Sequence, residues 1–206
     1  MIEVFNANSP LVLIGAGKMG GAMLTGWLDR GLAPSGVVVV EPRASDELKQ
    51  LCADRGVTLD AAAPSGVTAR VMITAVKPQV LADVLPGIAP LVGPATVVVS
   101  VVAGKTIDTF ATGLGTRSIV RTIPNTPAQV GRGITAAVAD PSVSADDRAL
   151  VAALLAAVGE VEWVEKESDI DLVTAVSGSG PAYVFHVVEA LAAAGDRKST
   201  RLNSSH

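Results

Sequence analysis

The sequence predicts an α/β protein with a mainly parallel, doubly wound sheet, followed by the start of an all-helical region. Three observations predict this fold. Short apolar runs alternate with helix-like segments over residues 1–164, as in βαβ units. Two of these runs, residues 69–76 and 95–102, are continuously apolar, which is typical of strands buried on both faces. After residue 164 the strand signal stops and the apolar residues follow helical spacing.

The individual elements follow from local patterns. Strands are predicted over residues 11–14, 36–41, 57–59, 69–76, 95–102, 118–122, 133–138 and 161–164. Helices are predicted over residues 18–30, 45–55, 79–85, 145–158, 168–176 and 180–195. Ser45 is a plausible N-cap for the second helix. Pro86 should end the third, because proline interrupts helical hydrogen bonding.

Composition and charge exclude several functional classes. The 206 residues are 49% hydrophobic and 3% aromatic, which fits a covered α/β core. A net charge of −4 leaves no basic footprint for nucleic acid. Residues 84–104 carry no charge, but prolines and glycines would interrupt a membrane-spanning helix there. With a single cysteine, Cys52, and no basic N-terminal region, the protein is predicted to be cytoplasmic.

Three glycines directly follow the first predicted strand and open the first helix, in the pattern Gly-x-Gly-x-x-Gly. Gly15 permits a tight turn, and Gly20 lets the helix pack closely on the strand. Gly17 lets the backbone approach a pyrophosphate, because a Cβ there would collide with it. The free N–H groups of the helix start favour phosphate. The pattern predicts dinucleotide binding, with a merely tight strand–helix turn as the alternative.

Two charged residues bear on the form of the dinucleotide. Glu41 ends the second predicted strand, where an acidic residue usually binds the ribose 2′-hydroxyl of NAD. Arg43 follows two positions later and could pair with the 2′-phosphate of NADP. Both could equally be solvated loop charges, so these residues leave the form of the cofactor open.

Further strand ends fall at the same edge of the predicted sheet, where ligands bind in open α/β folds. They are "AVKP" at residues 75–78, "SVVAG" at 100–104 and "RTIPNTP" at 121–127. Their prolines stiffen the loops, and the Asn125 amide can both donate to and accept from a ligand. Each could also be no more than a proline-terminated strand.

The stretch "SGSGPAYVF" begins at Ser177 and precedes the last predicted helix. Ser179 can cap that helix, with Pro181 in its first turn. Alternatively, the same free N–H groups could hold a carboxylate. No histidine, cysteine or acidic cluster has the spacing of metal ligands, so no metal site is predicted.

Taken together, "IGAGKMGGAM", "AVKPQ", "SVVAG", "RTIPNTPAQVGRG" and "AVSGSGPAYVF" closely resemble the pyrroline-5-carboxylate reductase family in order and spacing, over residues 11–195. The resemblance implies a Rossmann domain followed by a helical domain that interlocks two subunits into a homodimer or larger homo-oligomer. It also implies the last step of proline biosynthesis, in which a nicotinamide hydride adds to C5 of the cyclic imine 1-pyrroline-5-carboxylate to give L-proline. NADP(H) would be preferred, with NAD(H) possible.

The resemblance also implies roles for particular residues. The pyrophosphate would lie on Gly15, Ala16, Gly17, Lys18, Met19 and Gly20, and the adenosine ribose beside Glu41 and Arg43. The cofactor groove would be lined by Ala75, Val76, Lys77, Pro78, Val101, Val102 and Ala103. The substrate would face Asn125, Ser177, Gly178, Ser179 and Gly180. Family members carry, beyond this point, a Ser-Pro-Gly-Gly-Thr-like turn that holds the substrate carboxylate; without it, the catalytic residue stays unassigned.

The predicted organisation has three parts. Residues 1–164 form the dinucleotide-binding domain, residues 165–195 begin the dimerisation and substrate domain, and the polar residues 196–206 are expected to be a non-native tail. With the Ser-Pro-Gly-Gly-Thr-like turn missing, the chain is predicted to bind the cofactor but to reduce 1-pyrroline-5-carboxylate poorly or not at all. The alternatives are a β-hydroxyacid or deazaflavin-linked NADP oxidoreductase, or a cofactor-binding fragment without turnover. A β-hydroxyacid enzyme should carry a lysine on its first long second-domain helix, and residues 180–195 contain none.

Overall fold

The computed structural model describes the backbone of residues 4–203 and the side chains of residues 4–196. Within these residues one sheet of eight strands forms the centre, in the order β3-β2-β1-β4-β5-β6-β7-β8. The strands are β1 (Leu11–Ile14), β2 (Val37–Val40), β3 (Thr58–Asp60), β4 (Val71–Thr74), β5 (Val97–Ser100), β6 (Ile119–Pro124), β7 (Gly133–Ala139) and β8 (Gly159–Trp163). Every neighbouring pair is parallel except β6 and β7. The predicted mainly parallel sheet is therefore confirmed.

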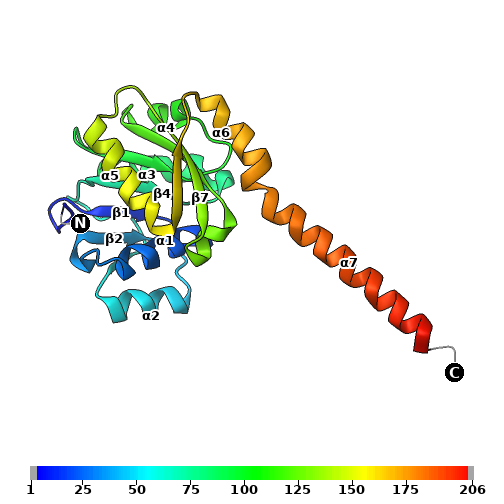
Figure 1. Cartoon of the computed structure of the whole chain (residues 1–206). Helices are drawn as coiled ribbons and strands as arrows, with labels where there is room; N and C mark the ends of the chain where they lie inside the picture. The colour runs from blue at the N-terminus through cyan, green and yellow to red at the C-terminus, as the bar shows by residue number, and fades with distance from the viewer. Residues whose placement is uncertain (1–3, 204–206) are drawn as a thin grey trace.

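Helices cover both faces of this sheet (Figure 1). On one face pack α1 (Lys18–Asp29), α2 (Asp46–Arg55) and α5 (Ala145–Leu155), and on the other α3 (Leu81–Ile88), α4 (Ile107–Leu114) and α6 (Glu167–Val173). Alternate strand residues supply the two cores: in β1, Leu11 and Leu13 belong to the first and Val12 and Ile14 to the second. Short 3-10 turns complete the body, as η1 (Pro34–Gly36), η2 (Pro78–Val80), η3 (Ala89–Leu91), η4 (Thr126–Val130) and η5 (Ala156–Val158).

Two helix predictions need correction. The helix predicted to end at Pro86 runs on to Ile88 with Pro86 inside it. Pro86 and Ala82, whose carbonyl loses its helical partner, are both exposed, so water can bind that carbonyl while Leu85 and Ile88 stay buried. Helix α4 was not predicted at all. Its start is nevertheless marked by Thr106, whose hydroxyl caps the helix by accepting from the Thr109 N–H.

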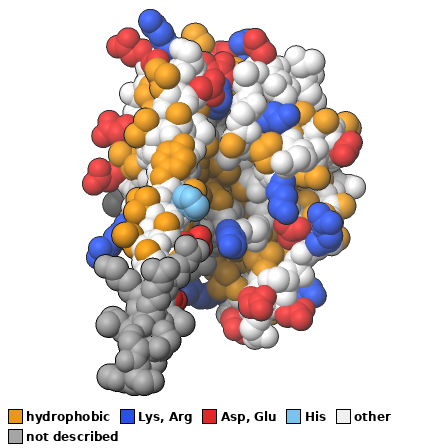
Figure 2. All heavy atoms as spheres, turned by 90° about the vertical axis from the view of Figure 1, so that its right-hand side faces the viewer, with side chains coloured by type: hydrophobic (Ala, Val, Ile, Leu, Met, Phe, Trp, Pro, Cys, Tyr) orange, Lys and Arg blue, Asp and Glu red, His pale blue; other side chains and the backbone are white. Residues whose placement is uncertain are grey.

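The C-terminal part forms a helical arm, defined here as α6, the π-helical turn η6 (Thr174–Gly178) and α7 (Gly180–Asn203). Figure 1 shows α7 leaving the body, and Figure 2 shows hydrophobic side chains along the described part of the helix. The helix predicted over residues 180–195 thus continues without a break to Asn203. The predicted tail at residues 196–206 stays a prediction, because residues 204–206 and the side chains from 197 onward lie outside the described part.

Side-chain contacts fix the helices to the body. The indole N–H of the fully buried Trp27 in α1 donates to the Leu154 carbonyl in α5, at 2.9 Å. At the start of α5, Asp147 pairs with Arg70 and bonds the Ser144 cap. Burial alone would raise the pKa of Asp147, but the hydrogen bonds from Arg70 and Ser144 outweigh it and lower this pKa. Among the described residues, no helix is long and apolar enough to cross a membrane.

Candidate dinucleotide site

The glycine loop joins β1 to α1 in a tight turn. Gly15 has φ +85°, and a Cβ there would lie 2.9 Å from the Ala75 carbonyl oxygen. A Cβ on Gly20 would collide with the Gly15 carbonyl oxygen. These two glycines are therefore required by the fold itself, as the sequence predicted.

Gly17 differs from its neighbours because a Cβ on it would meet nothing within 4 Å. Its backbone, φ −68° and ψ −158°, is one that any residue adopts. The fold therefore does not require glycine at this position. Gly17 is the N-cap of α1 and makes no side-chain cap hydrogen bond, so no capping side chain occupies the first N–H groups of α1. The arrangement fits a phosphate group approaching the backbone.

Glu41 links the glycine loop to the loop that follows β2. One carboxylate oxygen, Oε2, accepts from the Ala16 N–H at 3.1 Å, and the other, Oε1, accepts from the Arg43 N–H at 3.0 Å. Arg43 itself is exposed. Glu41 is therefore not a freely solvated loop charge, while the Arg43 guanidinium remains available at the rim of the site.

A cleft of about 1080 Å³ opens beside this loop. Nine predicted cofactor residues line it: Gly15, Ala16, Gly17, Lys18, Glu41, Arg43, Ala75, Val76 and Lys77. Met19 and Gly20 instead pack into the body, and Pro78 begins the turn η2. The volume is above the range usual for drug-sized ligands, so the cleft suits an extended molecule.

The cleft also has an apolar part that the sequence reasoning missed. Its lining comes from α2, the segment after β3, the end of η2, and α3: Leu48, Leu51, Ala61, Ala62, Ala63, Val80, Val84, Gly87 and Ile88. A flat aromatic base would find mainly carbon atoms here. One signal could have found part of it, because residues 61–63 follow a strand at the carboxyl edge of the sheet.

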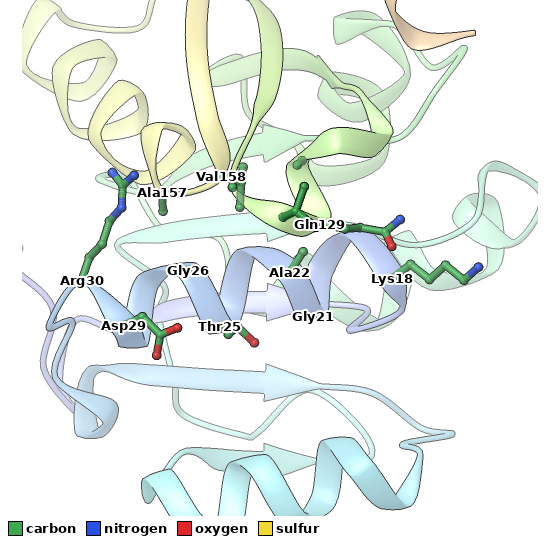
Figure 3. A pocket seen from close by; sticks show the side chains of 13 residues that line it. Lys18, Gly21, Ala22, Thr25, Gly26, Asp29, Arg30, Gln129, Ala157 and Val158 are labelled. Carbon is green, nitrogen blue, oxygen red and sulfur yellow. The ribbon is translucent and has the colours of Figure 1, made fainter. Parts of the chain in front are cut away.

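A second hollow of about 500 Å³ runs along the outer face of α1 (Figure 3). It lies between α1 and the turns η4 and η5, and Gly21, Ala22 and Thr25 belong to both hollows. On α1 the hollow is lined mainly by small residues. One of them, Gly26, packs against η5 so closely that a Cβ on it would lie 2.8 Å from the Ala157 carbonyl oxygen. This hollow was not predicted from the sequence.

The remaining predicted residues lie further along the carboxyl edge, outside the large cleft. Val101, Val102 and Ala103 follow β5, and Asn125 follows β6. The Asn125 amide nitrogen donates to the Ser177 hydroxyl at 3.2 Å, and its oxygen accepts from the Ile134 N–H at 3.0 Å. The structure therefore brings Asn125 and Ser177 together.

Helix α7 begins at Gly180, as predicted, but the prediction that the Ser179 side chain caps it is wrong. The helical arm is continuous here, and the Ser179 N–H and hydroxyl both donate to the Thr174 carbonyl, at 2.9 and 3.0 Å. The hydroxyl therefore does not cap α7, and the Ser179 N–H is not free to hold a carboxylate. The π-helical turn, which continues the backbone hydrogen bonds, is the reason.

No group of three or more potential metal-ligating side chains occurs among the residues that the structure describes.

Comparison with known proteins identifies the family. Residues 167–202 match the family model described as pyrroline-5-carboxylate reductase dimerisation, and residues 10–104 match that described as NADP oxidoreductase coenzyme F420-dependent. The pyrroline-5-carboxylate reductase of Pseudomonas aeruginosa is 34% identical over 188 residues, covering 91% of this chain and 69% of that protein. This chain belongs to the pyrroline-5-carboxylate reductase family. A second family member, from Synechocystis, is 40% identical over 90% of this chain and 69% of its own length.

Solved structures of the family share the fold. The pyrroline-5-carboxylate reductase from Coxiella burnetii superposes with a TM-score of 0.81 at 33% identity, covering 92% of this chain and 71% of that chain. The Plasmodium falciparum pyrroline carboxylate reductase, whose structure has NADP bound, gives 0.75 at 25% identity, over 94% of this chain and 71% of that chain. The fold predicted from the family resemblance is thereby confirmed.

Proposed function

We propose that this chain reduces 1-pyrroline-5-carboxylate to L-proline with NAD(P)H. The observation that carries the proposal is the glycine loop at the mouth of a cleft of about 1080 Å³, in a chain of the pyrroline-5-carboxylate reductase family. The alternative reductases of the same architecture are not favoured by the relatives. NADP(H) is the cofactor that this family membership supports.

The residues present fit a dinucleotide. The N–H groups at the start of α1 would hold the pyrophosphate, with Gly17 leaving room for it. The apolar lining beyond Glu41 would hold the adenine, and Arg43 would reach a 2′-phosphate. From there the carboxyl edge leads past Ala75 to residues 101–103 and Asn125, where the nicotinamide would lie.

When bound, NAD(P)H supplies a hydride for C5 of the imine. The chain contributes mainly by positioning, since an imine needs no covalent nucleophile or metal to accept hydride. The Ser177 hydroxyl accepts from Asn125 and keeps its own proton for donation. We propose that Ser177 donates this proton in a hydrogen bond to the substrate, with Gly178, Ser179 and Gly180 shaping the surface around it.

A titration followed by a turnover assay tests the function. NADPH binding is measured by the quenching of protein fluorescence, and turnover by loss of NADPH absorbance and formation of proline with the imine as substrate. Binding with turnover supports the proposal. Binding without turnover would favour the cofactor-binding fragment, and absence of binding would contradict the site assignment.

Replacing Arg43 with alanine should weaken NADPH selectively. The guanidinium would lose a charge-assisted hydrogen bond to the 2′-phosphate, worth roughly 1.5–3 kcal/mol, whereas NADH lacks that group. Separate titrations with the two cofactors measure the difference. Lys49→Ala, which removes an exposed cation of α2 outside the cleft lining, is the matched control. Equal losses for both cofactors would show that Arg43 does not read the 2′-phosphate.

We further propose that the helical arm pairs two copies of the chain into a homodimer, from which larger assemblies can form. Val184, Val188 and Leu191 repeat at helical spacing on α7 and are 60, 56 and 67% exposed. Apolar side chains in such numbers on one face mark an interaction surface. The matched dimerisation model over residues 167–202 supports this assignment.

The double substitution Val188→Glu and Leu191→Glu should dissociate the dimer. Each buried apolar side chain contributes about 1.5–3 kcal/mol, and a two-fold interface loses every contact twice. Analytical ultracentrifugation should therefore show a dissociation constant raised by at least about 100-fold. Glu189→Gln, on the same helix, is the control. An unchanged sedimentation coefficient in the double variant would refute pairing through this face.

We propose a cytoplasmic location, on chemical grounds. Cys52 is buried in the first core cluster, and burial raises the pKa of its thiol. A protonated, enclosed thiol forms no disulfide, which suits a reducing compartment.

A further inference from the structure

A cluster of charged side chains around one buried arginine lies beneath the proposed nicotinamide end. Arg121 in β6 is only 3% exposed. Its guanidinium donates to Glu167 Oε1 at 3.1 Å and to Asp171 Oδ1 at 2.6 Å, both in α6. We refer to these three residues as the Arg121 clasp. A buried guanidinium needs such acceptors, because desolvation of an unpaired charge is costly.

The clasp also holds the start of α4. The same Glu167 oxygen that pairs with Arg121 accepts from the Ile107 N–H at 2.7 Å. Ile107 is the first residue of α4 and ends the loop that begins after β5. The other end of that loop is held by Ser100, whose carbonyl accepts from the Thr122 hydroxyl and whose own hydroxyl accepts from the Val102 N–H. Residues 101–106 are therefore fixed at both ends, directly by Thr122 of β6 at one end and through Glu167, which pairs with Arg121 of β6, at the other.

The residue that directly follows β6 holds the helical arm at a second point. Asn125 lies four residues after Arg121, and it donates to Ser177 in the π-helical turn. Between these points the turn lies on the strand, since a Cβ on Gly178 would approach Ile123 Cγ1 to 3.7 Å. The arm is thus attached at α6 through Arg121 of β6, and at η6 through Asn125 immediately after β6.

We propose that Arg121 is a positioning residue for the nicotinamide end of the site. Through Glu167 it fixes the loop at residues 101–106, and through Glu167 and Asp171 it fixes the arm that carries Ser177. Arginine suits this role because its planar guanidinium can donate hydrogen bonds to two carboxylates at once, whereas lysine presents a single point charge. The inference rests on the proposed function, because it assumes that the nicotinamide lies between this loop and Ser177.

The test compares two ligands in Arg121→Lys. NADPH spans the whole site, whereas 2′,5′-ADP carries only the adenosine half and does not reach residues 101–106. We expect the dissociation constant of NADPH to rise at least about fivefold, with that of 2′,5′-ADP unchanged. The control is Arg70→Lys, which alters a partly buried ion pair with Asp147 at the opposite edge of the sheet and should affect neither ligand.

A loss shared equally by both ligands, or no loss, would overturn the positioning role. If Arg121→Lys does not fold, Glu167→Gln replaces it, because Glu167 is partly exposed and glutamine keeps an acceptor for the Ile107 N–H. The same comparison of NADPH with 2′,5′-ADP then tests the positioning role. Hydrogen exchange at Ile107 should be faster in this variant, because a neutral amide oxygen is a weaker acceptor than the carboxylate and no longer forms an ion pair with Arg121. Unchanged exchange with unchanged binding would also overturn the proposal. Failure of the unmodified chain to bind either ligand would instead refute the proposed function and this inference with it.

Discussion

Gly17→Val is expected to remove measurable NADPH binding while leaving the fold intact. The structure leaves open space at the Gly17 Cβ position, so the protein should tolerate the side chain. A bound pyrophosphate would occupy that space, and a tight turn offers little relaxation. A loss of about 3 kcal/mol or more corresponds to at least about 100-fold in the dissociation constant. Fluorescence titration and thermal unfolding of the same sample measure both effects.

The neighbouring glycine provides the contrasting control for this prediction. Gly20→Ala should lower the free energy of unfolding, because the new Cβ would collide with the Gly15 carbonyl oxygen. Gly17→Ala should weaken binding less than valine does, without a loss of stability. A folded Gly17→Val protein that binds NADPH normally would place the pyrophosphate elsewhere.

Trp27→Ala is expected to cause a large loss of stability. Trp27 is fully buried between α1 and the sheet, and truncation of a buried aromatic residue costs about 3–5 kcal/mol. The Leu154 carbonyl would also lose its indole partner. For a chain of this size the melting temperature should fall by roughly 6–20 °C. Urea unfolding followed by circular dichroism measures the free energy directly.

Trp27→Phe separates the two contributions. Phenylalanine fills most of the volume but cannot donate to Leu154, so we expect a smaller loss of about 1–3 kcal/mol. If alanine and phenylalanine destabilised equally, the hydrogen bond would dominate over packing. A melting temperature unchanged in Trp27→Ala would contradict the role of α1 as an anchored helix.

The nucleotide-binding half of the molecule was largely predictable, because its chemistry depends on local sequence. Gly15 and Gly20 have steric roles that a strand, a turn and a helix in succession already specify. The buried strands can also be predicted from continuous apolar runs in the sequence, because both faces of a parallel sheet are covered. By contrast, α4 has only eight residues, and threonines and a glycine lower its helix propensity, so its capping residue was its only strong signal.

Contacts between distant segments could not be read from the sequence. Glu41 was a candidate for a ribose hydroxyl, but its bonds to the Ala16 and Arg43 N–H groups depend on how two loops meet. The Arg121 clasp joins residues 46 and 50 positions apart, and its residues look like ordinary surface charges in the sequence. Likewise, Ser179 resembles a helix cap, and only the continuous π-helical turn reveals why it is not one.

The π-helical turn η6 determines the direction in which the apolar stripe of α7 faces. A π turn holds one more residue than an α turn, and each residue of an α-helix advances the side chains by about 100°. If the same five residues, Thr174–Gly178, formed a regular α-helix instead, they would turn further about the helix axis by nearly the advance of one residue. The stripe would then swing by about a quarter of a circle relative to the nucleotide-binding body. The π-helical turn thus sets the angle at which the arm would present its apolar stripe to the second subunit proposed above.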